Sequence, residues 1–139
     1  MRRQRLAAYG LAYDDGRVLI TQLSERTPLP AAWTLPGGGV DHGEHPEATL
    51  VREFAEETGL AAAVGGLVGV YSTHFTGQAP SGVLEDFHGI RLVYDVRVDG
   101  SLPPRVVDVG GTTSAVAWHP LGRVAELFAT PLLAEVLTP

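Results

Sequence analysis

Three glutamates with helical spacing are the residues best suited to chemistry in this sequence. Glu53, Glu56 and Glu57 are three or four positions apart, so a helix places their carboxylates on one side. Carboxylates this close repel one another unless a cation lies between them. Because the chain has no cysteine and that helix face has no histidine, the set favours Mg²⁺ or Mn²⁺ over zinc. The alternative is a solvated helix face, which the pattern by itself also allows.

A helix is predicted from about Pro46 to Thr58. Proline suits the first helical position, and Gly59 directly after the last position is typical of a left-handed cap. Four apolar residues fall on one side, which we expect to be buried: Ala48, Val51, Phe54 and Ala55. We expect Glu57 to be exposed to solvent together with the other two glutamates.

The loop before this helix brings further polar and flexible residues. Arg52 can reach Glu56 along the helix, or a carboxylate carried by the loop. One guanidinium does not neutralise three carboxylates, so negative charge remains for a divalent cation. We expect Arg52 to orient the glutamates by ion pairing and not to contact the substrate. Three consecutive glycines at 37–39 allow a tight turn and a close approach of the backbone to a ligand.

Loop and helix together resemble the Nudix box. After Gly38 come five residues and Glu44, then seven residues and the run Arg52-Glu53-Phe54-Ala55-Glu56-Glu57-Thr58-Gly59-Leu60. The family pattern is G-x5-E-x7-R-E-U-x-E-E-x-G-U, where U is bulky and apolar, and every specified position is matched. Phe54 stands where an aliphatic residue is commoner. The box covers a small part of the chain, so it indicates the chemistry better than the substrate.

The resemblance implies a fold and an activity. The fold is α/β, a Nudix-like α/β/α sandwich with a central mixed sheet. The activity is divalent-metal-dependent cleavage of a phosphoanhydride bond in a nucleoside diphosphate derivative. A nucleoside triphosphate, ADP-ribose or a nucleotide sugar would be such a small-molecule substrate.

The resemblance also implies roles for single residues. The metal ligands are Glu53, Glu56, Glu57 and the backbone carbonyl of Gly38, with Mg²⁺ as the cofactor and Mn²⁺ as the alternative. The catalytic set comprises Glu53, Glu56, Glu57, Arg52 and Glu44, in which Glu44 is a structural residue or a partner of Arg52, with contact to the metal as the alternative. The substrate-binding set is Gly38, Gly39 and Glu85. The base is Glu53 or a carboxylate from a later loop.

Two other functions share this resemblance. Some Nudix-like domains sense a nucleotide without cleaving it, and the intact box argues against that reading. An isomerase of prenyl diphosphates shares the fold, but its chemistry relies on a catalytic cysteine, which this chain lacks.

The remaining sequence predicts strands and two short helices. Strands are expected at Leu6–Tyr13, Val18–Leu23, Trp33–Leu35, Leu67–Thr73, His88–Val98 and Ser114–His119. We expect the first two to pair antiparallel through the turn residues Asp14-Asp15-Gly16. Helices are expected from Pro120 to about Phe128 and from Pro131 to Leu137. This order fits an α/β fold.

A long loop is predicted from His74 to Asp86, and long loops in compact domains are often functional. Phe75 and Phe87 either stack on a base or cover the edge of the core. Glu85 or Asp86 is a candidate for a further metal ligand or a general base.

Composition limits the class of protein. A chain of 139 residues predicts one domain, residues 1–139. The net charge of −6 argues against extended nucleic acid as a partner. The apolar run after the basic N-terminus is too short for a signal peptide or a membrane span, so we expect a cytoplasmic protein without a membrane partner. Arg2, Arg3 and Arg5 are expected to form a frayed terminus rather than a phosphate site. A homodimer is suggested by analogy only.

Overall fold

The computed structural model describes residues 1–78 and 81–137. Its strands are β1 (Arg2–Leu11), β2 (Tyr13–Asp14), β3 (Arg17–Leu23), β4 (Trp33–Thr34), β5 (Gly37–Gly39), β6 (Ala63–Gln78), β7 (Leu84–Arg97) and β8 (Thr113–Pro120). The helices are α1 (Pro46–Thr58), the 3₁₀ helix η1 (Leu121–Glu126) and α2 (Pro131–Leu137). In the described part of the chain no helix is long and apolar enough to cross a membrane.

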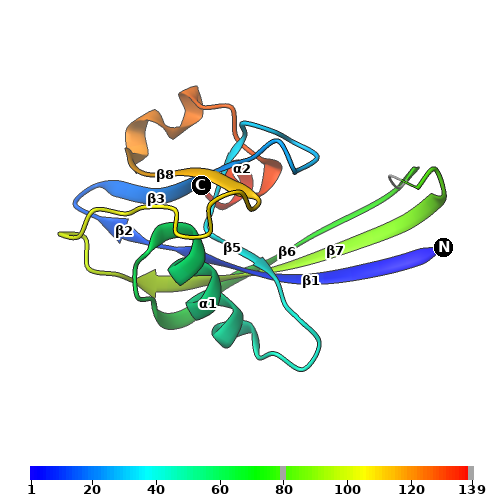
Figure 1. Cartoon of the computed structure of the whole chain (residues 1–139), viewed down its shortest axis with the longest axis horizontal. Helices are drawn as coiled ribbons and strands as arrows, with labels where there is room; N and C mark the ends of the chain where they lie inside the picture. The colour runs from blue at the N-terminus through cyan, green and yellow to red at the C-terminus, as the bar shows by residue number, and fades with distance from the viewer. Residues whose placement is uncertain (79–80, 138–139) are drawn as a thin grey trace.

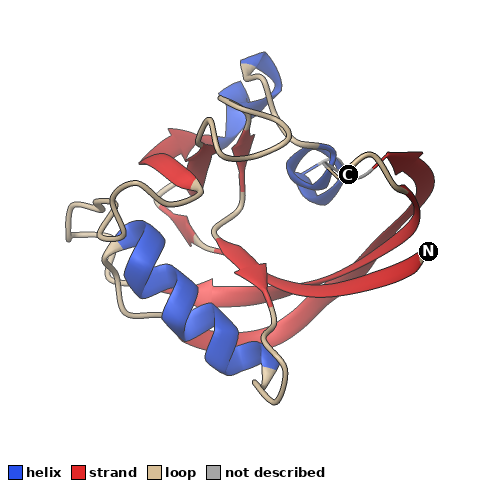
Figure 2. Cartoon of the chain, turned by 45° about the vertical axis from the view of Figure 1, so that its right-hand side comes forward, coloured by secondary structure: helices blue, strands red, loops and turns tan. Residues whose placement is uncertain are grey.

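The strands form two sheets with helices on both sides. One sheet has the order β5-β1-β7-β6, with β1 parallel to β7, and the other joins β2, β3 and β4 with β8 on β3. Consecutive residues of β3 point to opposite cores: Leu19 packs with Leu50 and Phe54 of α1, and Ile20 packs with Leu133 of α2. Figure 2 shows α1 and the two short helices on opposite sides of the strands. The predicted α/β architecture with a mixed sheet is confirmed.

The outer halves of β1, β6 and β7 form a three-stranded ribbon that extends away from the helices (Figure 1). The loop predicted from His74 to Asp86 is wrong, because β6 runs on to Gln78 and β7 begins at Leu84. Pairing continues through the Phe75–Phe87 pair, where facing aromatic side chains stabilise the ladder. Ala79 and Pro80 of the predicted loop lie outside the described residues.

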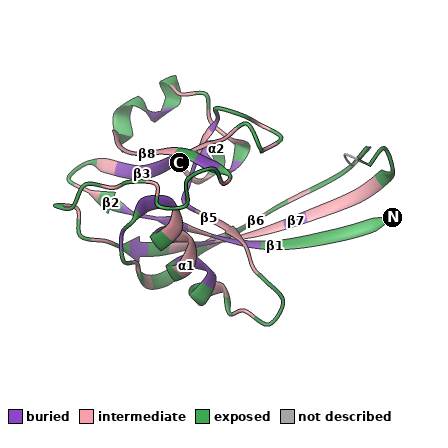
Figure 3. Cartoon of the chain, in the orientation of Figure 1, coloured by how far each residue is buried: buried purple, intermediate pink, exposed green. Residues whose placement is uncertain are grey.

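The N-terminal arginines belong to this ribbon. The prediction of a frayed terminus is wrong, since β1 begins at Arg2, which pairs with Asp86 of β7. The outer end of β1 is nevertheless exposed, as its colour in Figure 3 shows. Arg2, Arg3 and Arg5 are therefore ordered by backbone pairing, and their side chains are exposed.

The predicted antiparallel pairing of Leu6–Tyr13 with Val18–Leu23 holds only next to the turn and is wrong beyond it. Asp15 and Gly16 have positive φ values of 49° and 74° and form the expected turn. The ladder it starts is short and joins only Tyr13–Asp14 to Arg17–Val18. Both edges of β1 are already taken by β5 and β7, so β3 is the strand of another sheet.

Helix α1 has the predicted bounds, with Pro46 in the first turn and Gly59 as a left-handed cap at φ 70°. Its predicted buried face is wrong apart from Phe54, because Ala48, Val51 and Ala55 are exposed. The buried residues are Thr49, Leu50, Phe54, Glu57 and Thr58. The helix is rotated so that its large side chains are covered, and this rotation carries one glutamate inwards.

Candidate active site

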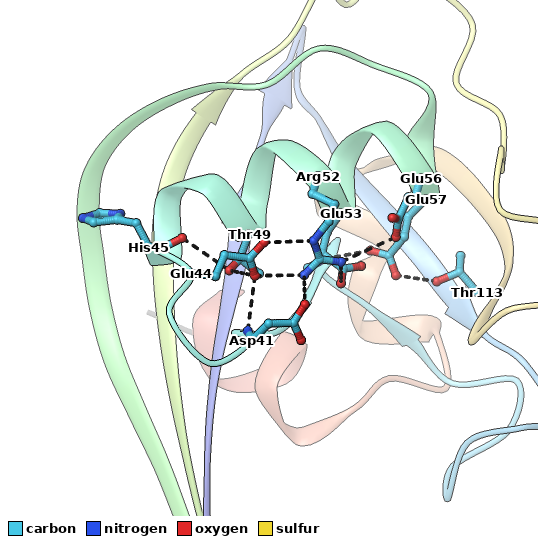
Figure 4. A network of polar contacts seen from close by, with 10 residues as sticks. Asp41, Glu44, His45, Thr49, Arg52, Glu53, Glu56, Glu57 and Thr113 are labelled. Atoms are coloured by element: carbon cyan, nitrogen blue, oxygen red, sulfur yellow. Dashed lines mark hydrogen bonds and ion pairs between the residues drawn. The ribbon is translucent and has the colours of Figure 1, made fainter.

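Arg52 is the centre of a network of acidic side chains (Figure 4). Its Nε and Nη2 donate to the two carboxylate oxygens of Glu44, both at 3.0 Å. Its Nη1 donates to Glu53 at 3.0 Å and lies 3.7 Å from Glu56. Such a two-pronged contact fixes a carboxylate better than a point charge does. Arg52 thus contacts Glu44, Glu53 and Glu56 at once, and its orienting role stays a prediction.

Glu44 is itself held in place by the loop and the start of α1. It accepts hydrogen bonds from the Thr49 hydroxyl at 2.7 Å and the Asp41 backbone N–H at 3.2 Å. The hydrogen bonds from Arg52 and Thr49 lower the pKa of Glu44 to about 2. Glu44 therefore stays ionised and keeps Arg52 aligned beside the other glutamates.

Glu57 is buried, which corrects the prediction that it is exposed. Only 8% of its surface is accessible. One carboxylate oxygen accepts the Gly37 backbone N–H at 2.8 Å, and the other accepts the Thr113 hydroxyl at 2.6 Å. Burial raises the pKa of Glu57 to about 8, against the lowering effect of these two hydrogen bonds. Burial also raises the pKa of Glu53, and Arg52 opposes that shift.

The glycine-rich strand β5 lies close against these two carboxylates. A Cβ on Gly38 would stand 2.7 Å from an oxygen of Glu53, and one on Gly39 would stand 3.0 Å from Nη2 of Arg5. Gly37, at φ 149°, would place a Cβ 2.2 Å from the Ala8 carbonyl oxygen. The close backbone approach expected of the glycines is therefore present, and Gly38–Gly39 separate an acidic from a basic side chain.

Two cavities meet at the glutamates. The larger, of about 480 Å³, is lined by Gly37–Gly39, Glu53 and Glu57 together with the arginines Arg3, Arg5, Arg26 and Arg91. The smaller, of about 230 Å³, is lined by Glu53, Glu56, Glu57 and Asp108. The site thus brings carboxylates and positively charged side chains together around joined cavities, an arrangement suited to an anion bound beside a cation.

Glu85 is not brought to this site. It lies on the ribbon, 3.8 Å from Nη1 of Arg3, and lines neither cavity at the glutamates. Leu92, which is level with Gly38 across the sheet, lies seven positions further along the strand, a span of roughly 23 Å. Asp86 bonds His74 at another surface cavity of the ribbon.

Sequence reasoning missed Asp108, Arg26 and Arg91, and it dismissed Arg3 and Arg5. Asp108 is carried by an irregular segment whose backbone is fixed by a hydrogen bond from its N–H to the Glu56 carbonyl, at 2.9 Å. No spacing rule connects that segment to α1. For Arg3 and Arg5 the signal was present in their alternation, which is typical of one face of a strand.

The donor set fits a hard divalent cation in its chemistry, since it offers carboxylate oxygens and no sulfur. Two observations support a charged occupant: Glu53 and Glu57 are both largely withdrawn from water, and both have raised pKa values. Within residues 1–78 and 81–137, no three His, Asp or Glu side chains are arranged to hold a metal ion as they stand. Arg52, Gly37 and Thr113 now occupy those oxygens, so ligation requires an exchange of partners.

Comparison with known proteins agrees with this geometry. A family model described as NUDIX domain matches residues 1–138. The RNA pyrophosphohydrolase of Saccharophagus degradans is 32% identical over 128 residues, which cover 82% of this chain and 72% of that protein. The ADP-ribose pyrophosphatase of Methanocaldococcus jannaschii is 40% identical over 68 residues, which cover 49% of this chain and 40% of that protein. This chain therefore spans less than half of the latter relative.

Solved structures extend the likeness to the whole fold. The MutT NUDIX hydrolase from Burkholderia pseudomallei superimposes with a TM-score of 0.75 at 29% identity, covering 97% of this chain and 96% of that one. The resemblance first carried by the box is thereby confirmed over nearly every residue. The chain belongs to the NUDIX family.

Proposed function

We propose that this chain, acting as a single domain, is a divalent-metal-dependent hydrolase. Its substrate is a nucleoside diphosphate derivative, of the class that includes nucleoside triphosphates, ADP-ribose and nucleotide sugars, and the bond cleaved is a phosphoanhydride. The names of the relatives, an RNA pyrophosphohydrolase and an ADP-ribose pyrophosphatase, support the reaction class. Mg²⁺ is the proposed ion. A homodimer and a cytoplasmic location stay predictions from the sequence.

One observation carries the proposal: carboxylates and arginines line the same cavity. Glu53, Glu57, Arg5 and Arg91 all line the 480 Å³ space. A diphosphate is anionic along its length, so it needs positive charge at both of its ends. Arginines supply that charge at one end, and a cation held by the carboxylates would supply it at the other.

The proposed ligands are Glu53, Glu56, Glu57 and the Gly38 carbonyl. An ion bound there would offset the charge of the phosphates and lower the pKa of a bound water. Arg52 acts through Glu44 and Glu53 as a positioning residue, because it holds their carboxylates at 3.0 Å. Partners of this kind typically change metal affinity or activity by about 10- to 100-fold when removed.

Asp108 has the role that was predicted for Glu85 or Asp86, that of a carboxylate from outside α1. It lines the 230 Å³ cavity together with Glu53, Glu56 and Glu57. A carboxylate there can accept the proton of an attacking water, so none of the proposed metal ligands has to act as the base. Asp108→Asn is expected to lower kcat by about 100-fold or more, with a smaller change in KM, as measured by initial rates.

The test of the function is product analysis on a substrate panel with and without Mg²⁺. The panel holds the nucleoside triphosphates, ADP-ribose, several nucleotide sugars and a dinucleoside polyphosphate, and chromatography identifies the products. Magnesium-dependent release of a phosphate product from one class is the expected result. Glu56→Gln should abolish it, whereas Glu47→Gln, on the exposed first turn of the same helix, should not.

Absence of cleavage across the panel, combined with tight binding of one member, would reject the enzyme in favour of a nucleotide-sensing domain. Binding by the Glu56→Gln variant distinguishes the two functions, because a nucleotide-sensing domain should bind its nucleotide equally well after this substitution.

A further inference from the structure

The ribbon carries an aromatic row on the face that looks into the cavity. In the register of β1, β7 and β6, Arg3, Phe87 and Phe75 lie side by side. The two rings have centroids 5.4 Å apart, and Cζ of Arg3 lies 5.8 Å from the centre of the Phe87 ring. Phe75 is 57% exposed. The two ring planes are inclined at 44° and the Arg3 guanidinium lies over the Phe87 ring, so the row is an accessible aromatic surface with a positive charge beside it and not a covered part of the core.

The next row towards the body has no side chain at its centre. Gly89 pairs with Arg5, and the ring of Phe87 leans over it, with Cε1 3.1 Å from where a Cβ of residue 89 would stand. A cavity of about 440 Å³ opens here, lined by Arg5, Phe87 and Arg91 and reached by Pro131 of α2. This volume lies within the roughly 300–1,000 Å³ range of small-molecule sites.

Two guanidinium groups connect this hollow to the carboxylates. Arg5 and Arg91 line both the 440 Å³ cavity and the 480 Å³ cavity that holds Glu53 and Glu57. Among the described residues, neither arginine forms an ion pair with a carboxylate. Arg91 is steadied by its hydrogen bond to the Thr73 hydroxyl, at 2.7 Å. Carboxylates, guanidiniums and aromatic rings thus follow one another along the sheet.

We propose that this surface binds the nucleotide half of the substrate, with a phosphate on Arg5 and Arg91 and the base stacked on Phe87 and Phe75. The inference rests on the proposed function and deepens it. The substrate is a nucleoside compound whose base points along the ribbon, away from α1. Every base has a π-face, so stacking selects for the presence of a base much more than for its identity. Phosphate esters without a base are poor ligands.

The test is calorimetric binding of nucleoside monophosphates and of ribose 5-phosphate in EDTA, so that neither metal nor turnover enters. Wild-type protein should bind AMP and UMP about 5- to 150-fold more tightly than ribose 5-phosphate, the range expected for one stacked base. Phe87→Leu should lower the affinity for AMP by a factor within the same range and leave the affinity for ribose 5-phosphate unchanged. Arg5→Gln should weaken both, because the phosphate is common to them.

His88→Ala is the matched control. His88 stands between Phe87 and Gly89 in sequence, but its side chain faces the other side of the ribbon, where Nδ1 bonds Gln4 at 3.0 Å. This variant should bind AMP like the wild type. Thermal unfolding of each variant checks that the fold is intact.

Equal affinity for AMP and ribose 5-phosphate, or no binding of either, would overturn the inference. The outcome is separable from that of the proposed function. Magnesium-dependent hydrolysis of the panel together with equal affinity for AMP and ribose 5-phosphate rejects the nucleotide surface alone, and tighter binding of AMP than of ribose 5-phosphate without any hydrolysis rejects the enzyme alone.

Discussion

Glu57 is a buried carboxylate with both oxygens hydrogen-bonded, and its substitution separates chemistry from stability. Glu57→Gln keeps the shape of the side chain and offers an oxygen to Gly37 and an amide to Thr113, the partners at 2.8 and 2.6 Å. The melting temperature should change little. Loss of a charged ligand should lower kcat by about 100-fold or more, the scale of losing a preorganised electrostatic group. Steady-state kinetics and thermal unfolding measure the two effects, and near-wild-type activity would sink the assignment of this residue.

Glu44 gives a dependence of stability on pH. Its folded pKa of about 2 lies below the value of about 4.3 expected in the unfolded chain. The unfolded state therefore binds more protons between these values, and the stabilisation is present above about pH 4.3 and lost as the pH falls towards 2. Urea unfolding of wild type and Glu44→Gln should show a larger stability difference at pH 6 than at pH 3. A difference independent of pH would show that the Arg52 contact does not set the pKa.

The sequence predicted contacts between residues that are close along the chain and missed contacts between residues that are far apart. Arg52 and Glu44 lie eight positions apart on one loop and helix, so their pairing follows from the box. The burial of Glu57 depends on Thr113, which is 56 positions away, and spacing along α1 does not report such a contact. Asp108 escaped prediction for the same reason.

At the scale of elements, α1 shows that the ends of a helix are easier to predict than its rotation. Pro46 and Gly59 fixed its bounds through local backbone preferences. Its apolar set was ambiguous because alanines contribute little area on either side. The burial of Leu50 and Phe54 decides the orientation, and it places Val51 outside.

Two substitutions in this helix measure that orientation. Phe54 is fully buried, so Phe54→Ala should cost about 3–5 kcal/mol of unfolding free energy. Val51 is 48% exposed, and Val51→Ala should stay within about 0.5 kcal/mol of wild type. Chemical denaturation monitored by circular dichroism gives both values. Similar losses for the two variants would restore the buried face expected from the sequence and contradict the rotation seen here.

The ribbon was missed because its strands are stabilised by pairing between distant residues and not by local preferences. Glycine and proline between His74 and Asp86 are typical of loops and led to the prediction of a loop. The segment instead belongs largely to two strands, which are stabilised by pairing with each other and with β1. Strand pairing joins residues distant in sequence, so it outweighs weak local preferences. The same pairing turned the N-terminal arginines from a tail into one face of a strand.

At the scale of the molecule, the distribution of charge matters more than its sum. The net charge is −6, which by itself disfavours an anionic substrate. Four of the ten arginines nevertheless line one cavity: Arg3, Arg5, Arg26 and Arg91. They come from β1, β7 and the segment after β3, so composition indicated the sign of the whole surface and could not reveal this local excess.

The salt dependence of KM shows whether substrate binding is governed by attraction to the arginines of the cavity or by repulsion from the net negative charge of the molecule. A phosphate about 4 Å from a guanidinium at a protein surface gains about 4 kcal/mol at an effective dielectric constant of 20, whereas a unit charge about 20 Å away across water contributes about 0.2 kcal/mol. The interaction with the distant charge is also screened first, because the Debye length is about 10 Å at 0.1 M salt.

KM for the preferred nucleotide should therefore rise between 20 and 200 mM KCl, with Mg²⁺ held constant. Arg5→Gln should raise KM at low salt and flatten this dependence, because one of the contacts that salt weakens is then missing. A KM that falls with added salt would mean that repulsion by the whole molecule dominates, and that the arginines of the cavity do not hold the substrate.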